Sequence, residues 1–129
     1  MIFYKAIENL RELILLDASG QSYFLSQEDT MFEVCPDNGA DKFTYEELVH
    51  ALGDEVYICD TLDVVRLVRY NSRLIDYALV CSAFGPIYGL GINRRASQVL
   101  SEKMVWGHAL FCPKSCLRKE DFAPSVLFK

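Results

Sequence analysis

The sequence contains little of what non-globular proteins are rich in. Seven glycines and four prolines among 129 residues exclude a collagen-like or low-complexity chain. Hydrophobic residues make up 51 % and charged residues 24 %, a balance that excludes an intrinsically disordered chain, which is poor in apolar residues. We therefore expect a single globular domain that covers residues 1–129, a usual length for one domain.

No apolar run is long enough for a membrane helix, which needs about 20 such residues. The most apolar stretch, residues 74–92, is interrupted by Asp76 and Pro86. Lys5 and Glu8 interrupt the first residues, which therefore do not resemble a secretory signal. The five cysteines are odd in number and spread through apolar segments, which argues against a disulfide framework. We expect reduced thiols and a cytoplasmic protein.

The chain also lacks the motifs by which common enzymes are recognised. It has no G-x-S-x-G nucleophile motif and no H-E-x-x-H zinc motif. His108, Cys112 and Cys116 are residue types that bind zinc, but Pro113 interrupts their register and no fourth ligand follows at a typical spacing. We therefore predict no metal and no cofactor, and binding is favoured over catalysis. An enzyme that acts through a Cys–His pair is kept as an alternative.

Hydrophobic periodicity predicts an α+β fold, a compact domain with a small, mostly antiparallel sheet and three to five helices. Strands are expected over residues 21–26, 31–35, 55–60 and 105–112. Helices are expected over residues 3–16, 44–52, 61–84 and 93–104, the third with a break near Asn71. The helix that follows Asn93 would bury Ala96, Val99, Leu100 and Met104.

The strongest local signal is the start of the helix over residues 44–52. Thr44 can cap this helix, and Glu47 is placed to reach back to the capping residue. Phe43 and Leu48 are spaced to form the hydrophobic staple around the cap. Gly53 can end the helix because it adopts the left-handed conformation without strain.

Charge is divided unevenly along the chain. Residues 1–60 carry 13 acids and 3 bases, a net charge of −10, whereas residues 61–129 carry 5 acids and 10 bases, a net charge of +5. Either the two halves face each other, or each presents its own surface to a partner. An acidic protein is not expected to bind nucleic acid directly, since that requires a basic surface. The acidic residues predicted to meet a partner are Glu46, Glu47, Asp54 and Glu55.

A glycine-rich segment precedes two arginines in the second half of the chain. Gly89 and Gly91 would let the backbone approach a ligand, while Asn93 would cap a helix that begins with Arg94 and Arg95. Cations are unfavourable at a helix N-terminus, so a bound anion would relieve the conflict. Alternatively, the segment is a tight turn whose arginines pair with acids of the first half. The further residues predicted for an anion site are Tyr88, Arg66, Arg69 and Arg73.

These observations lead to two hypotheses for the function. The first is a non-catalytic binding protein, a stoichiometric inhibitor of the immunity or anti-defence type, whose acidic half meets a protein with a basic surface. The second is a binder or sponge for a small anionic, nucleotide-like ligand at the arginine pair. No membrane partner is expected. Because the end of the chain, residues 122–129, is apolar, we expect it to dock either onto the domain itself or onto a second copy of the chain, so a homo-oligomer is a further alternative.

Overall fold

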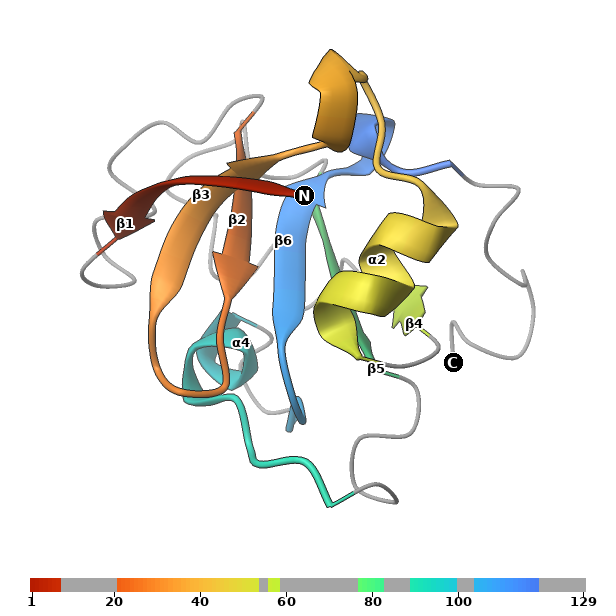
Figure 1. The fold of residues 1–129 in the computed structure, drawn as a ribbon. Coiled ribbons are helices and arrows are strands. Elements are labelled where there is room, and N and C mark those ends of the chain that lie inside the picture. Colours follow the sequence, from red (N-terminus) through yellow and green to blue (C-terminus); the bar gives the residue numbers. More distant parts are fainter. Residues whose placement is uncertain (8–20, 54–55, 59–76, 83–88, 100–103, 119–129) are drawn as a thin grey trace.

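The computed structural model describes residues 1–7, 21–53, 56–58, 77–82, 89–99 and 104–118 (Figure 1). Six strands, two α-helices and two short 3-10 helices lie in this part of the chain. In order they are β1 (Ile2–Ile7), β2 (Ser22–Leu25), β3 (Met31–Cys35), η1 (Asp37–Gly39), α2 (Tyr45–Leu52), β4 (Val56–Ile58), β5 (Tyr77–Ser82), α4 (Arg94–Val99), β6 (Ala109–Pro113) and η3 (Lys114–Cys116). No helix in these ranges is long and apolar enough to cross a membrane.

The strands form one antiparallel sheet in the order β1-β3-β2-β6-β5-β4. β2 and β3 form a hairpin, and the Ser26 amide donates to the Thr30 carbonyl across its turn at 2.8 Å. Asp29 in this turn has a φ of 68°, a conformation that aspartate tolerates better than most residues. β1 and β4 are the two edge strands of the described sheet.

Both faces of the central strands β2, β5 and β6 are covered, so alternate residues of these strands enter two separate cores (Figure 1). Leu79 of β5 and Phe111 of β6 lie in the core that includes Ala96 of α4. Val80 and Leu110 point the other way, into the core that Leu48 and Leu52 of α2 complete. Strands buried on both faces are apolar throughout rather than alternating.

The predicted α2 cap is confirmed. The Glu47 amide donates to Thr44 Oγ1 at 3.1 Å, and the Thr44 amide donates to Glu47 Oε1 at 3.2 Å. Phe43 and Leu48 are both buried in the same core, as the hydrophobic staple requires. Gly53 ends the helix with a φ of 83°, in the left-handed region.

The predicted fold class is wrong in its helix content. The described residues hold two α-helices, of eight and six residues, instead of three to five, and most of the regular structure is sheet. Residues 77–82 of the expected helix 61–84 form β5, because a strand buried on both faces lacks the alternation that distinguishes it from a buried helix. The rest of that segment up to residue 76 lies outside the described residues.

Two other expected helices are also corrected. In place of the helix expected over residues 3–16, residues 3–7 form part of β1, where Phe3 and Tyr4 favour an extended chain. Residues 8–16 lie outside the residues that the structure describes. Asn93 does precede a helix, but α4 is described only to Val99, and Met104 is 60 % exposed instead of buried. Ala96 is buried as predicted.

Candidate functional site

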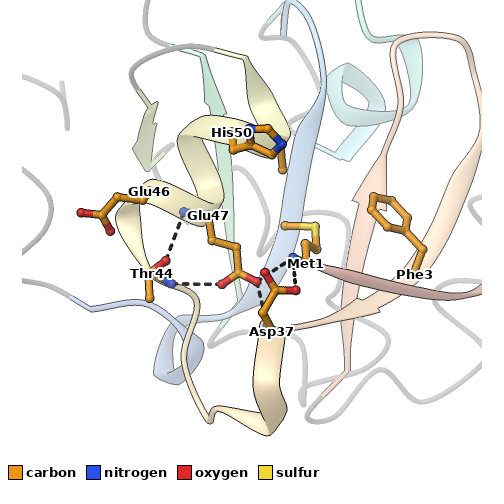
Figure 2. A pocket seen from close by; sticks show the side chains of 8 residues that line it. Met1, Phe3, Asp37, Thr44, Glu46, Glu47 and His50 are labelled. Atoms are coloured by element: carbon orange, nitrogen blue, oxygen red, sulfur yellow. Dashed lines mark hydrogen bonds and ion pairs between the residues drawn. The ribbon is translucent and has the colours of Figure 1, made fainter.

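A pocket lies between the start of β1 and helix α2 (Figure 2). Its volume is about 610 Å³. Figure 2 shows the side chains of α2 on one side of the pocket and Phe3 on the other, with Asp37 below Met1. The pocket is lined by Met1, Phe3, Asp37, Thr44, Glu46, Glu47, His50 and Ala51.

Glu47 organises the wall of the pocket. One of its carboxylate oxygens, Oε1, accepts from the Thr44 amide in the cap of α2. The other, Oε2, accepts from the Asp37 amide at 2.8 Å and lies 2.8 Å from the Met1 ammonium nitrogen. Only 7 % of the Glu47 side chain is exposed. This carboxylate therefore joins α2, η1 and the start of β1, and both its oxygens are engaged within the chain.

The Met1 ammonium is held by two carboxylates. It donates to Asp37 Oδ1 as well as pairing with Glu47. Partial burial acts to lower the pKa of the ammonium, but the hydrogen bonds to Asp37 and Glu47 outweigh it and raise the pKa above its usual value. The same contact lowers the pKa of Asp37. Asp37 and Glu47 thus bind a primary ammonium at the edge of the pocket.

Several polar and aromatic groups of the pocket remain accessible to solvent. Glu46 is exposed and makes no hydrogen bond or ion pair within the described part of the chain. Half of the Asp37 side chain, 51 %, is exposed. His50 is also exposed, and 47 % of Phe3 remains accessible although its ring contacts Phe24 and Phe32 edge-on. Three carboxylates against one ammonium leave the pocket acidic.

The predicted arginine pair lies elsewhere, beside the β2–β3 turn. Arg94 Nη2 donates to Asp29 Oδ2, and Arg95 Nε donates to Asp29 Oδ1 at 2.9 Å. Desolvation works to raise the pKa of Asp29, but the hydrogen bonds from the two guanidinium groups lower it overall. Arg94 remains 69 % exposed, whereas Arg95 is 19 % exposed. Both arginines therefore already have a carboxylate partner.

The neighbours of the arginine pair have structural roles. Asn93 is fully buried, and its amide nitrogen donates to the carbonyls of Leu25 and Gly107 at 2.7 and 2.9 Å. Its amide oxygen accepts from the Ala96 amide at 3.0 Å, so Asn93 caps α4 as predicted. Gly89 has a φ of 72°, which suits glycine. Among the other predicted site residues, Tyr88, Arg66, Arg69, Arg73, Asp54 and Glu55 lie outside the described residues.

The histidine–cysteine series is not assembled into a site. Cys112 is buried, and this desolvation raises the pKa of its thiol. His108 Nδ1 accepts from the Gln27 amide at 3.1 Å, so this nitrogen is already engaged in holding the hairpin turn. No group of three His, Cys, Asp or Glu residues that could hold a metal ion is found within the ranges the structure describes.

Of the eight residues that line the pocket, sequence reasoning predicted only Glu46 and Glu47 as binding residues. Phe3 was part of the helix expected over residues 3–16, and neither Met1 nor Asp37 was assigned to an expected site. No local pattern connects Met1 with Asp37, which is 36 residues away. The only available signal was the second carboxylate oxygen of Glu47, which a capping box leaves free for a further donor. Comparison of the chain with protein-family models, with curated proteins and with solved structures gives no match.

Proposed function

We propose that this protein is a non-catalytic, cytoplasmic binding protein that neutralises a macromolecular partner by occupying a basic group on its surface. The observation that carries the proposal is the acidic pocket between β1 and α2, which keeps Glu46 and half of Asp37 accessible. Stoichiometric binding suits a chain of 129 residues without a catalytic motif. The free thiols of Cys35, Cys112 and Cys116 agree with a reducing compartment.

The chemistry of the pocket favours a cation attached to an apolar stem. Its carboxylates attract an ammonium or guanidinium group, and the Met1 ammonium is already bound by two of them. Phe3 and Ala51 offer apolar surface beside those charges, along which the methylene groups of lysine or arginine can pack. The net charge of −5 would also accelerate the approach of a basic partner.

The alternative, an anionic and nucleotide-like ligand at Arg94 and Arg95, has weaker support. An anion at this position would compete with the Asp29 carboxylate, which already pairs with both guanidinium groups. Removing Asp29 would then strengthen anion binding. An Asp29→Asn variant that binds a nucleotide no better than the original chain, with Kd measured by calorimetry, would count against this alternative.

Hexalysine amide is a suitable probe for the basic partner. We expect it to shift the amide resonances of Glu46, His50 and Asp37 in nuclear magnetic resonance spectra of the full chain, and to bind more weakly as salt increases. Glu46→Lys should weaken binding about fivefold to tenfold at low salt, since one close charge pair contributes about 1 kcal/mol in water.

Glu33→Lys is the matched control, because it makes the same change of charge on the other face of β3, in register with Tyr23. It should weaken binding less than Glu46→Lys. Equal effects of the two reversals, or resonance shifts that avoid the pocket, would contradict the proposed site.

A further inference from the structure

We propose that the partner contributes an extended segment that adds to the edge of β1 as a further strand and places an arginine or lysine side chain in the pocket. This inference rests on the proposed function, and it names the form in which the basic group arrives. Two observations carry it: the edge of β1, which has no second strand partner among the described residues, and the position of Phe3 on both that edge and the pocket wall.

β1 presents an edge suited to strand addition. Within the described part of the chain it pairs with β3 alone, which leaves the outward amides and carbonyls of its other side without a strand partner. Large apolar side chains stand exposed along it, with Ile2 at 40 %, Phe3 at 47 % and Tyr4 at 67 %. The opposite edge of the described sheet, β4, has only three residues.

Proteins usually protect an edge of this kind with proline, charge or a bulge. β1 contains no proline, and Lys5 is its one charged residue. Its bulge lies between Phe3 and Ala6, after the regular pairs Ile2–Cys35 and Phe3–Val34. Ile2 and Phe3 therefore belong to a regular strand, and the bulge that could hinder the addition of another strand comes only after Phe3.

The pocket opens beside this regular part of β1. Phe3 contacts Phe24 and Phe32, which places it on the face of the sheet that α2 covers. A residue directly opposite Phe3 on an added strand would lie on the same face, with its Cβ about 4.5 to 5.5 Å away. Figure 2 shows Phe3 on the side of Met1 opposite to α2, with Asp37 and Glu47 close to Met1.

Charge complementarity specifies the side chain at that position. An arginine or lysine opposite Phe3 can pack its stem on the aromatic ring and direct its cationic head toward the carboxylate of Asp37, which lies next to Met1 (Figure 2). Apolar residues at the neighbouring positions of the segment would then lie near Ile2 and Tyr4 on the other face. The predicted partner segment is thus extended, apolar at alternate positions and basic at one position between them.

N-methylated peptides test the strand without altering the protein. The probe is an eight-residue peptide of alternating Val and Thr with one central Arg. Methyl groups on the amides of alternate residues block hydrogen bonds on one side of the strand, and the complementary set blocks the other side. We expect one set of methylated amides to weaken binding of the peptide at least tenfold and the complementary set to leave it nearly unchanged. Only the peptides that bind should protect the β1 amides from hydrogen exchange.

The outcomes separate this inference from the proposed function. If both methylated sets bind like the parent peptide while hexalysine still shifts the pocket resonances, strand addition is overturned and the acidic binding site stands. If neither the peptide nor hexalysine affects the pocket, the proposed function fails as well. A chain that sediments as a dimer with its own β1 amides protected would make a second copy the occupant and would also overturn the inference.

Discussion

Replacing Glu47 tests whether one carboxylate holds β1, η1 and α2 together. Glu47→Ala removes the acceptor of the Thr44 and Asp37 amides and of the Met1 ammonium. A hydrogen bond to a charged group contributes about 1.5 to 3 kcal/mol when it is shielded. Thr44 and Asp37 are exposed and can bind water instead, so the expected loss of unfolding free energy is about 2 to 3 kcal/mol in total.

Glu47→Gln distinguishes the charge from the geometry. Glutamine keeps one carbonyl oxygen to accept a backbone amide, but it loses the negative charge that pairs with Met1. We expect a loss of about 1 to 1.5 kcal/mol, clearly smaller than for alanine. Glu46→Ala is the control, because the adjacent Glu46 is exposed and unbonded among the described residues, and its loss should stay within about 0.5 kcal/mol.

Urea unfolding followed by circular dichroism measures these differences, provided that the slope of the transition is unchanged. A double-mutant cycle of Glu47→Ala with Thr44→Ala should give a coupling energy of at least about 0.5 kcal/mol, because the two residues share the capping box. A cost below about 0.5 kcal/mol for Glu47→Ala, or equal costs for the Ala and Gln variants, would refute this role of the carboxylate.

Three further predictions concern Asn93, Gly107 and, in the β2–β3 hairpin turn, Asp29. Asn93→Ala should lower the unfolding free energy by about 3 to 5 kcal/mol in urea titrations, because it leaves two buried carbonyls and one amide without their partner. A loss below about 1 kcal/mol would be inconsistent with these bonds. Gly107→Ala should cost about 1 to 3 kcal/mol in the same assay, since the φ of 76° disfavours a side chain and the new Cβ would stand 2.7 Å from Leu90 Cδ1; a neutral effect would show that neither constraint matters. Asp29→Asn tests the ion pairs by pH: because the folded-state pKa of Asp29 is lowered, its stabilisation is present above the unfolded-state pKa near 4 and is lost as pH falls through the folded-state value. The Tm of the original chain should therefore exceed that of Asp29→Asn at pH 6, and the difference should shrink as the pH falls below about 4. A difference that does not depend on pH would contradict the assignment.

Elements with local signals could be predicted from the sequence. The strands at residues 22–25 and 31–35, and the cap of α2 at Thr44, follow from turn residues, aromatic content and the capping box, all within a few positions of each other. β1 and β5 could not be recognised in this way. β5 is buried on both faces and shows no alternation, and the edge position of β1 depends on its pairing with β3.

The candidate site was predictable only in part, because its contacts join residues that are far apart in the sequence. Charge alone pointed to Glu46 and Glu47, but it did not distinguish the exposed carboxylate from the one that binds Thr44, Asp37 and Met1. The arginine pair was predicted with its two alternatives, and its pairing with Asp29 agrees with the arginines meeting an acid of the first half. That contact depends on the β2–β3 turn, whose position relative to α4 no local pattern specifies.

Intermolecular nuclear Overhauser effects between the Arg-containing peptide and the full chain address the binding site most directly. If the pocket beside β1 receives a basic side chain, the δ protons of the arginine should show effects to the ring protons of Phe3 and to the methyl group of Met1. With the peptide at saturation, effects confined to protons outside this pocket, or none at all, would contradict the assignment of the pocket as the binding site.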